Sequence, residues 1–373
     1  MERDHDECRQ IIIMLSEVPG IGWRTIQKAV ASGAWRESSG QDEAAYVKAG
    51  FSIEQARSAV KRIGQGLVAP GSSYEKAAEL GAAVITPLDA AYPKYLLQIP
   101  QPPWVLYALG RLELLKRPIV AVVGTRNPTA YGRHTASMLT EQLSAGGMTI
   151  ASGLARGIDS KAHEAALRGA GSTIAVLACA VDCCYPSENR TLYRDIAEKG
   201  LLLSETPIGT PLHPGMFPLR NRIIAGLSLG TLVIEGAIGS GSLITAAQAL
   251  DMNRDLFAVP GPISSPKSEG PNSLIRQGAK LVSAAEHIFE EYTWLGDELL
   301  KHSHSSAFSQ RQSDKELSAD ERKIIALLRE RPLSINELHQ LIAVPFGHLS
   351  ALLINLCIKR RIEQQSGSLY IAL

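Results

Sequence analysis

Four short segments of this 373-residue chain combine glycine, arginine and hydroxyl residues in a way that suits the binding of an anion. Glycine lets a ligand approach the backbone closely, arginine donates two parallel hydrogen bonds to a phosphate, and a helix N-terminus adds free N–H groups. In chain order, the candidate residues are Gly124, Thr125, Arg126, Ser152, Gly153, Arg156, Gly157, Arg220, Asn221, Arg222, Ser240, Gly241 and Thr245. Any one segment alone could be a tight turn that binds nothing, but the four together predict phosphate binding.

The number of cations points to a polymer of phosphates. The arginines in the set exceed what one mononucleotide needs, and Arg190 could extend the surface. A row of cations along a crevice suits a polynucleotide, and about five phosphate contacts would cost roughly a hundredfold in affinity between about 50 and 200 mM salt. The nearby aromatic residues that could stack on bases are Tyr131, Tyr185 and Phe217. We expect at least one arginine to pair with an acid among Asp159, Asp182, Glu205 and Glu235.

Other chemistries are less well supported. The glycine spacing is not GxGxxG and no acidic ribose partner follows, so a dinucleotide fingerprint fits poorly. Asp159 and His163 could act as a base and its orienting partner, but no nucleophile accompanies them. Capping and packing roles are favoured, with Asp159 as the N-cap of its helix. The five cysteines show no metal-ligand spacing, so we expect no metal and no other cofactor.

The middle of the chain, residues 73–296, predicts a doubly wound, mostly parallel, Rossmann-like α/β sheet. Continuous apolar runs at 119–123, 148–151, 173–177, 231–234 and 256–259 alternate with helical patterns such as 133–144 and 159–167. Strands buried on both faces and separated by helices are typical of parallel sheets. Residues 81–110 should add short extra strands. The candidate loops follow the strands, at the edge where open α/β sheets bind ligands.

Two flanking regions predict further domains. Residues 1–72 form a helical domain whose turn at 19–22, Pro-Gly-Ile-Gly, is either a helix-hairpin-helix that approaches DNA phosphates or an ordinary tight turn. Residues 297–316 are polar and serine-rich and predict a linker. Residues 317–373 read as three helices and a hairpin, the outline of a winged helix, with Ser334 as an N-cap and Glu337 three residues later.

Composition narrows the class of protein. Formal net charge is +1, so any surface for nucleic acid must come from local clustering of positive charge. The N-terminus lacks the basic start and apolar stretch of a signal peptide, and no run of about 18 apolar residues could span a bilayer. We therefore expect a cytoplasmic protein without a membrane partner.

The motifs closely resemble those of the DNA-processing protein A (DprA/Smf) family. They are VVGTRNPTAYG, SGLARGIDSKAHEAAL, YPSEN, FPLRNRIIAGLS, EGAIGSGSLITAAQAL and AVPGPISSPKSEGPNSLIRQGA, in the family's order over roughly 115–290. The resemblance implies a dimer that binds and protects single-stranded DNA and loads the recombinase RecA in natural transformation, with single-strand binding protein as a further candidate partner. It implies that Arg126 contacts DNA, that the SGLARGID and RNR motifs line the same pocket, and, from a looser alignment, that Arg190 contributes.

Three functional readings remain open at this point. The leading one is a single-strand DNA-binding and loading protein that performs no covalent chemistry. The second is a Rossmann-like hydrolase of nucleotides or N-glycosidic bonds, although the PGGxGTxxE motif of such enzymes is absent and the structural role of Glu235 is favoured. In the third, the terminal domains bind the DNA and the core serves only as a dimer scaffold.

Overall fold

The computed structural model describes residues 2–295, 318–342, 344–358, 361–365 and 369–372. The chain divides into two compact units, 1–303 and 304–373, each of which is described by itself below. The predicted boundary after residue 72 falls inside the first unit and stays a prediction. The predicted linker at 297–316 lies outside the described residues.

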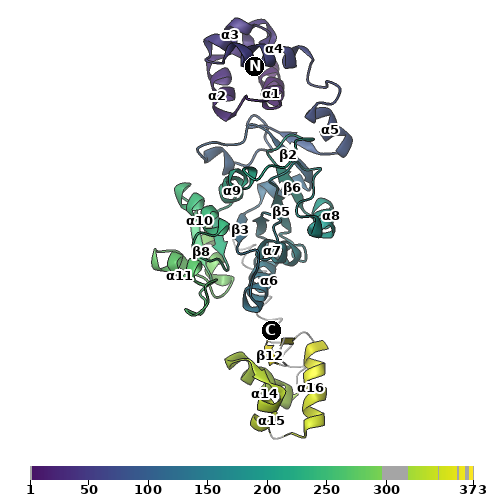
Figure 1. The fold of residues 1–373 in the computed structure, drawn as a ribbon, viewed down its shortest axis with the longest axis vertical. Coiled ribbons are helices and arrows are strands. Elements are labelled where there is room, and N and C mark those ends of the chain that lie inside the picture. The colour runs from purple at the N-terminus through teal and green to yellow at the C-terminus, as the bar shows by residue number, and fades with distance from the viewer. Residues whose placement is uncertain (1, 296–317, 343, 359–360, 366–368, 373) are drawn as a thin grey trace. The chain divides into compact units, whose positions relative to one another are not determined.

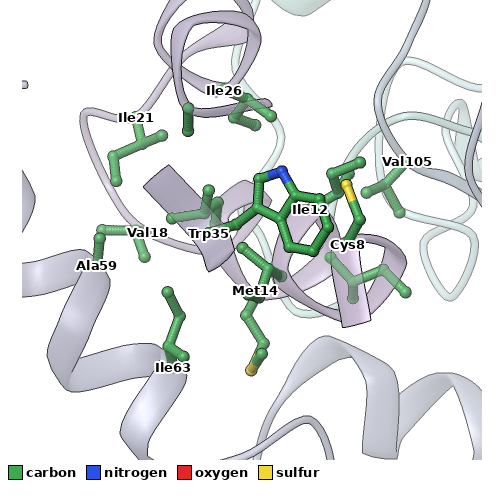
Figure 2. Close-up of a cluster of buried hydrophobic side chains, with 14 of the residues drawn as sticks. Cys8, Ile12, Met14, Val18, Ile21, Ile26, Trp35, Ala59, Ile63 and Val105 are labelled. Carbon is green, nitrogen blue, oxygen red and sulfur yellow. The ribbon is translucent and has the colours of Figure 1, made fainter. Parts of the chain in front are cut away.

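The first unit begins with helices. They are α1 (Glu2–Ser16), α2 (Trp23–Ser32), the 3-10 helix η1 (Ala34–Gly40), α3 (Glu43–Lys48), α4 (Ile53–Gly64) and α5 (Ser73–Leu80) (Figure 1). Figure 2 shows Val105, which directly precedes strand β2 (Leu106–Gly110), among the apolar side chains of these helices. Tyr107 of β2 and Ile208 belong to the same buried cluster. The N-terminal helices therefore share a hydrophobic core with the sheet.

The sheet has the order β1-β2-β6-β5-β4-β3-β7-β8-β9. Its strands are β1 (Ala83–Ile85), β2 (Leu106–Gly110), β3 (Ile119–Val123), β4 (Thr149–Ser152), β5 (Thr173–Val176), β6 (Leu201–Ser204), β7 (Gly230–Val233), β8 (Asp255–Ala258) and β9 (Lys280–Leu281). All neighbours from β6 to β9 pair in parallel, while β1 and β2 are antiparallel additions at one edge. The predicted doubly wound, Rossmann-like sheet is confirmed.

Helices cover both faces of the sheet. They are α6 (Ala130–Ala145), α7 (Ile158–Ala166), α8 (Arg190–Lys199), α9 (Met216–Leu227), α10 (Gly241–Asp251), α11 (Glu269–Arg276) and α12 (Glu286–Phe289), with short 3-10 helices η2 (Leu96–Gln98), η3 (Leu112–Lys116), η4 (Ser187–Asn189) and η5 (Glu290–Leu295). Val120 and Val122 of β3 pack with α6 and α7, whereas Ala121 packs on the opposite face with α9 and α10. Each face of β3 is thus buried, as its unbroken apolar sequence requires.

Two expectations about these elements are wrong. The segment with Arg220 and Arg222 is not a loop before a helix but lies inside α9. Pro218 does not prevent this, because it occupies the first helical turn, where proline is tolerated. The N-cap of α7 is Gly157 rather than Asp159. In addition, β6 was not predicted.

The second unit has helices α14 (Ala319–Glu330), α15 (Ile335–Leu341) and α16 (Phe346–Ile358), and strands β10 (Leu333–Ser334), β11 (Ile362–Gln365) and β12 (Leu369–Ala372). The strands pair in the order β10-β12-β11. Ser334 and Glu337 form the predicted capping box at the start of α15. This arrangement confirms the predicted winged helix.

Among the described residues, no single helix is long and apolar enough to cross a membrane. One bent pair of helices, Ile335–Leu341 and Phe346–Cys357, reaches the required length and apolar composition only when the two helices are taken together.

Candidate nucleic-acid interface

A crevice of about 720 Å³ lies at the carboxyl ends of β3 and β7. The chain leaves β3 toward β4 on one side and β7 toward β8 on the other, so this is the topological switch point where open α/β sheets bind ligands. The crevice is lined by Val123, Gly124, Thr125, Arg126, Ala155, Asp159, Tyr185, Pro214, Phe217, Pro218, Arg220, Asn221, Ile224, Ser240, Gly241, Ser242, Ile244 and Thr245. We call this space the crevice from here on.

Most of the predicted residues meet there. Eight of them line the crevice: Gly124, Thr125, Arg126, Arg220, Asn221, Ser240, Gly241 and Thr245. Gly153 and Arg156 line a smaller adjoining cavity of about 110 Å³ that also touches Arg126. The predicted residues outside both cavities are Ser152, Gly157, Arg190 and Arg222.

Arg126 is the exposed cation of the crevice. It follows β3 in a loop whose backbone is fixed by a hydrogen bond from the Thr125 N–H to the Glu235 carbonyl oxygen, at 2.7 Å. Its guanidinium carbon lies 5.8 Å from the centre of the Phe217 ring. Within the described residues, no carboxylate lies at ion-pair distance from Arg126. Its charge is therefore available to a ligand.

Arg220 occupies a different environment although it touches the same space. Its side chain is buried and donates to the carbonyl oxygens of Gly153, at 2.7 Å, and of Val176. Burial lowers the pKa of Arg220 to about 10, an effect that the nearby carboxylate of Asp159 opposes. Arg220 thus supports the floor of the crevice from below, whereas the sequence predicted an open phosphate contact.

The loop of residues 153–157, which follows β4 and which we call the β4 loop, is held by buried polar groups. The Asp159 carboxylate accepts hydrogen bonds from the N–H groups of Gly153, at 3.2 Å, and Ala155, at 3.4 Å. Burial raises the pKa of Asp159, with Arg220 pulling it down. Ser152 is buried and donates its hydroxyl to the Val122 carbonyl oxygen at 2.6 Å, so it supports the sheet rather than facing a ligand.

Two glycines of the β4 loop are required by close packing. A Cβ at Gly153 would lie 2.5 Å from the Arg220 Nη1 atom. At Gly157, φ is +82° and a Cβ would lie 2.4 Å from the Thr125 carbonyl oxygen. The second contact joins the β4 loop to the loop that carries Arg126, which gives Gly157 a positioning role outside the crevice.

His163 has no arrangement for acid–base catalysis. It is fully buried on α7, accepts the Leu154 N–H at Nε2 (3.2 Å) and contacts Thr173 Oγ1 at Nδ1 (2.7 Å). Burial lowers the pKa of His163 to about 3, with a smaller contribution from Arg220, so the ring is neutral at ordinary pH. The packing role favoured by the sequence is confirmed for His163.

Two other predicted arginines are ion-paired, which confirms the expectation that at least one would be. Arg222, whose side chain is 14% exposed, donates to both Glu205 carboxylate oxygens, at 2.6 and 2.5 Å. Arg156 pairs with Glu188, and both side chains are more than half exposed. Arg222 is therefore part of the framework, whereas Arg156 stays accessible to solvent.

Arg190 is exposed at the first position of α8 and, among the described residues, has no ion-pair partner. Burial raises the pKa of the neighbouring Cys184 thiol, and the positive charge of Arg190 opposes the rise. Because Cys184 directly precedes Tyr185 of the crevice, Arg190 lies beside the site although it lines neither cavity.

Two of the three predicted aromatic residues face the crevice. Tyr185 and Phe217 both line it, with ring centres 5.5 Å apart and planes tilted by 59°. Tyr131 does not line it and donates its hydroxyl to the Pro260 carbonyl oxygen. Sequence reasoning missed the apolar contribution of Pro214 and Ile244, which nothing in their local sequence marks.

Asn189 was quoted only as part of the YPSEN motif, yet it joins two loops of the site. Its Nδ2 atom donates to the Leu154 carbonyl oxygen at 2.9 Å and to Ser160 Oγ at 3.1 Å. The turn after β5 is thereby fastened to the β4 loop. Nothing in the local sequence around Asn189 identifies these partners, because they lie 29 and 35 residues away.

Glu235 supports the structure of the site. It is 2% exposed and accepts hydrogen bonds from the Thr129 N–H (2.9 Å) and hydroxyl (2.5 Å). A Cβ at Gly132 would lie 2.2 Å from its Oε2 atom, so α6 begins directly against this carboxylate. The described part of the chain contains no group of three or more His, Cys, Asp or Glu side chains that could hold a metal ion.

Comparisons with known proteins agree on one family. A model described as DNA recombination-mediator protein A matches residues 83–293, and one described as DprA winged helix domain matches 309–368. The DNA processing protein DprA of Bacillus subtilis is 47% identical over 214 residues, which are 57% of this chain and 72% of that protein. Protein Smf of Synechocystis is 36% identical over 314 residues, 77% of this chain and 79% of its own.

Solved structures of DNA processing protein A from two organisms resemble this chain. The chain resembles the X-ray structure of DNA processing protein A (DprA) from Streptococcus pneumoniae with a TM-score of 0.66 and 34% identity, covering 76% of this chain and 97% of that one. It also resembles DNA processing protein A from Helicobacter pylori, whose structure is described by its single-stranded DNA binding mode. The TM-score there is 0.52 at 30% identity, covering 59% of this chain and 97% of that one.

Proposed function

The chain belongs to the DNA recombination-mediator protein A family, and from this premise we propose that it binds single-stranded DNA across the crevice at the carboxyl ends of β3 and β7. The observation that carries the proposal is Arg126: an exposed guanidinium, without an ion-pair partner among the described residues, beside Phe217 at the rim of an otherwise largely apolar space. A relative from Helicobacter pylori is described as binding single-stranded DNA, which supports the same ligand class.

The groups of the crevice divide into two tasks. Tyr185 and Phe217 offer ring faces on which bases stack, and such stacking is tolerant of sequence. Arg126, Arg156 and Arg190 are the accessible cations for the phosphates. Gly124, Gly241 and the N-terminus of α10, with Thr125, Ser240 and Thr245, add backbone and hydroxyl groups along the same wall.

The remaining predicted residues hold this surface in place. Arg220, with Ser152, Gly153 and Gly157, fixes the loops through buried hydrogen bonds and close packing. Arg222 is engaged by Glu205. Asn221 lines the crevice one position after Arg220. Three accessible arginines, rather than the predicted five phosphate contacts, predict a weaker salt dependence than the sequence did.

Family membership supports a finer role. We propose that the chain protects incoming single strands and loads RecA onto them during natural transformation, acting as a homodimer in the cytoplasm, with single-strand binding protein as a further partner. A loading protein must hold the strand by its backbone and later release it. A small number of solvent-exposed arginine contacts permits both. Binding alone, without a covalent step, is sufficient for this role.

The direct test is a fluorescence anisotropy titration of a labelled oligothymidylate with the full chain. Arg126→Ala should weaken binding by about tenfold or more, because it removes a charge-assisted contact. Arg168→Ala is the matched control: that arginine is exposed and ion-paired, and it follows the carboxyl end of α7, at the opposite edge of the sheet. Equal affinity of wild type and Arg126→Ala would overturn the proposed site.

The two competing readings have their own assays. The hydrolase reading would be established if the purified chain released free base from nucleotides and Glu235→Gln abolished this release. The hydrogen bonds of Glu235 to Thr129, which hold the framework of the site, do not favour this reading. Removal of the second unit, residues 304–373, tests whether the C-terminal domain is required for DNA binding. We expect the first unit, kept whole because its N-terminal helices share a core with β2, to retain the single strand.

A further inference from the structure

We infer that Glu188 acts as an internal competitor of DNA phosphate at Arg156 and thereby limits the affinity of the crevice for single strands. The inference rests on the proposed function of the crevice and adds a residue that tunes it. It follows from an exposed ion pair in which Arg156 lines the cavity that adjoins the crevice, while Glu188 lines neither cavity.

The two side chains come from neighbouring loops. Arg156 belongs to the β4 loop, and Glu188 to the 3-10 helix η4 that follows β5. Because β4 and β5 pair in parallel, both loops emerge at the same edge of the sheet. Asn189, the residue after Glu188, fastens them together through its bonds to the Leu154 carbonyl oxygen and to Ser160 Oγ.

This fastening places the Glu188 carboxylate against the Arg156 guanidinium. The Arg156 Nη2 atom donates to Glu188 Oε1, and the side chains are 62% and 55% exposed. The pair is therefore held by ordered backbone, yet it is open to solvent and to a ligand. Carboxylate and phosphate oxygens compete for the same donor edge of a guanidinium group.

Arg156 also lies where a strand would need it. It lines the small cavity together with Arg126, Tyr185 and Phe217, which also line the crevice. A phosphate next to a base stacked on Tyr185 would compete with Glu188 for the Nη2 atom of Arg156 and displace the carboxylate from it. The displaced carboxylate would remain close to the bound phosphate and repel it, so Glu188 opposes binding both before and after the strand arrives.

The size of the effect is bounded by what exposed ion pairs contribute. Their measured worth corresponds to a change in an equilibrium constant of about fivefold at most. The neutral isostere Glu188→Gln keeps the shape of the side chain and removes its charge. We expect it to bind an oligothymidylate about two- to fivefold more tightly than wild type, and the gain should shrink as salt screens the removed repulsion.

The chain offers a matched control in a second exposed pair. Arg168 donates to Glu141 at 2.7 Å, with side chains 53% and 50% exposed, at the edge of the sheet opposite the crevice. Glu141→Gln changes net charge by the same amount as Glu188→Gln. A gain that is produced by net charge alone would therefore be equal in the two variants.

The experiment is an anisotropy titration of labelled oligothymidylate with full-length wild type, Glu188→Gln, Glu141→Gln, Arg156→Ala and the double variant Arg156→Ala/Glu188→Gln, at about 50 and 300 mM salt. The inference is supported if Glu188→Gln binds more tightly than wild type and Glu141→Gln does not, and if this gain is smaller at high salt and strongly reduced in the Arg156→Ala background. Equal or weaker binding by Glu188→Gln, an equal gain in Glu141→Gln, or a gain that survives in the Arg156→Ala background overturns it. If wild type itself does not bind the oligonucleotide, the proposed function is overturned. Failure of the inference and failure of the proposed function therefore give different results.

Discussion

The sharpest contrast within the site is between two arginines that the sequence treats alike. Arg126 is exposed and has no ion-pair partner in the part of the chain that the structure describes, whereas Arg220 is buried and donates to the carbonyl oxygens of Gly153 and Val176. Replacement of each by methionine, which keeps much of the aliphatic volume, should therefore have opposite consequences for folding and for binding. One pair of variants therefore tests both environments.

Arg220→Met should destabilise the first unit. Each buried carbonyl that loses its donor costs about 1–3 kcal/mol, so two carbonyls cost about 2–6 kcal/mol. The buried carboxylate of Asp159 also loses the positive charge that faces it. At about 2–4 °C per kcal/mol for a domain of a few hundred residues, the melting temperature should fall by at least about 4 °C.

Arg126→Met should leave stability within about 0.5 kcal/mol of wild type, because the substitution is at the surface and breaks no ion pair. It should still weaken single-strand binding by about tenfold or more. The assays are thermal unfolding of both variants at neutral pH and anisotropy with a labelled oligothymidylate. An Arg220→Met protein that melts like wild type but loses affinity like Arg126→Met would refute the assignment of Arg220 to the framework.

Three further predictions concern the same region. Gly157→Ala should destabilise the protein by about 1–3 kcal/mol and weaken DNA binding, because φ is +82° and the new Cβ meets the Thr125 carbonyl oxygen; thermal unfolding and anisotropy measure both. His163 has a folded pKa of about 3 against an unfolded pKa of about 6.5, so the unfolded state takes up the proton and stability falls as pH drops below about 6.5. Relative to His163→Gln, wild type should lose about 2 kcal/mol more between pH 6.5 and 5, and parallel stability curves would contradict this. With three accessible arginines, affinity for single strands should fall only about twentyfold between about 50 and 200 mM salt, at about −0.7 per contact; a hundredfold fall would mean that further cations contact the strand.

Much of the fold follows from local sequence. The unbroken apolar run of β3 and the similar runs of β4, β5, β7 and β8 identify strands buried on both faces. Strand β6 was not predicted, although its four residues, Leu201–Ser204, match β4 and β5 in length and follow Gly200, the C-cap of α8, which is a helix-stop signal that the sequence carries. The capping box at Ser334 was predictable because both of its partners lie within one turn.

The site was predictable as a set of loops but not as a set of roles. The family assignment from the motifs is confirmed, and eight of the predicted residues line the crevice. Arg220 could not be separated from Arg126 by sequence, because its partners Gly153 and Val176 lie 67 and 44 residues away. Asp159 has the residue type of an N-cap, yet its carboxylate reaches back to the β4 loop and leaves the capping position to Gly157.

Photo-crosslinking of an oligothymidylate to the full-length chain, followed by mass spectrometric mapping, asks directly where the strand lies. The crevice at the carboxyl ends of β3 and β7 predicts adducts on Tyr185 or Phe217, and their loss in Arg126→Ala at the same protein concentration. Adducts found only on residues 1–72 or only on the winged helix, with both crevice aromatics unmodified, would contradict it.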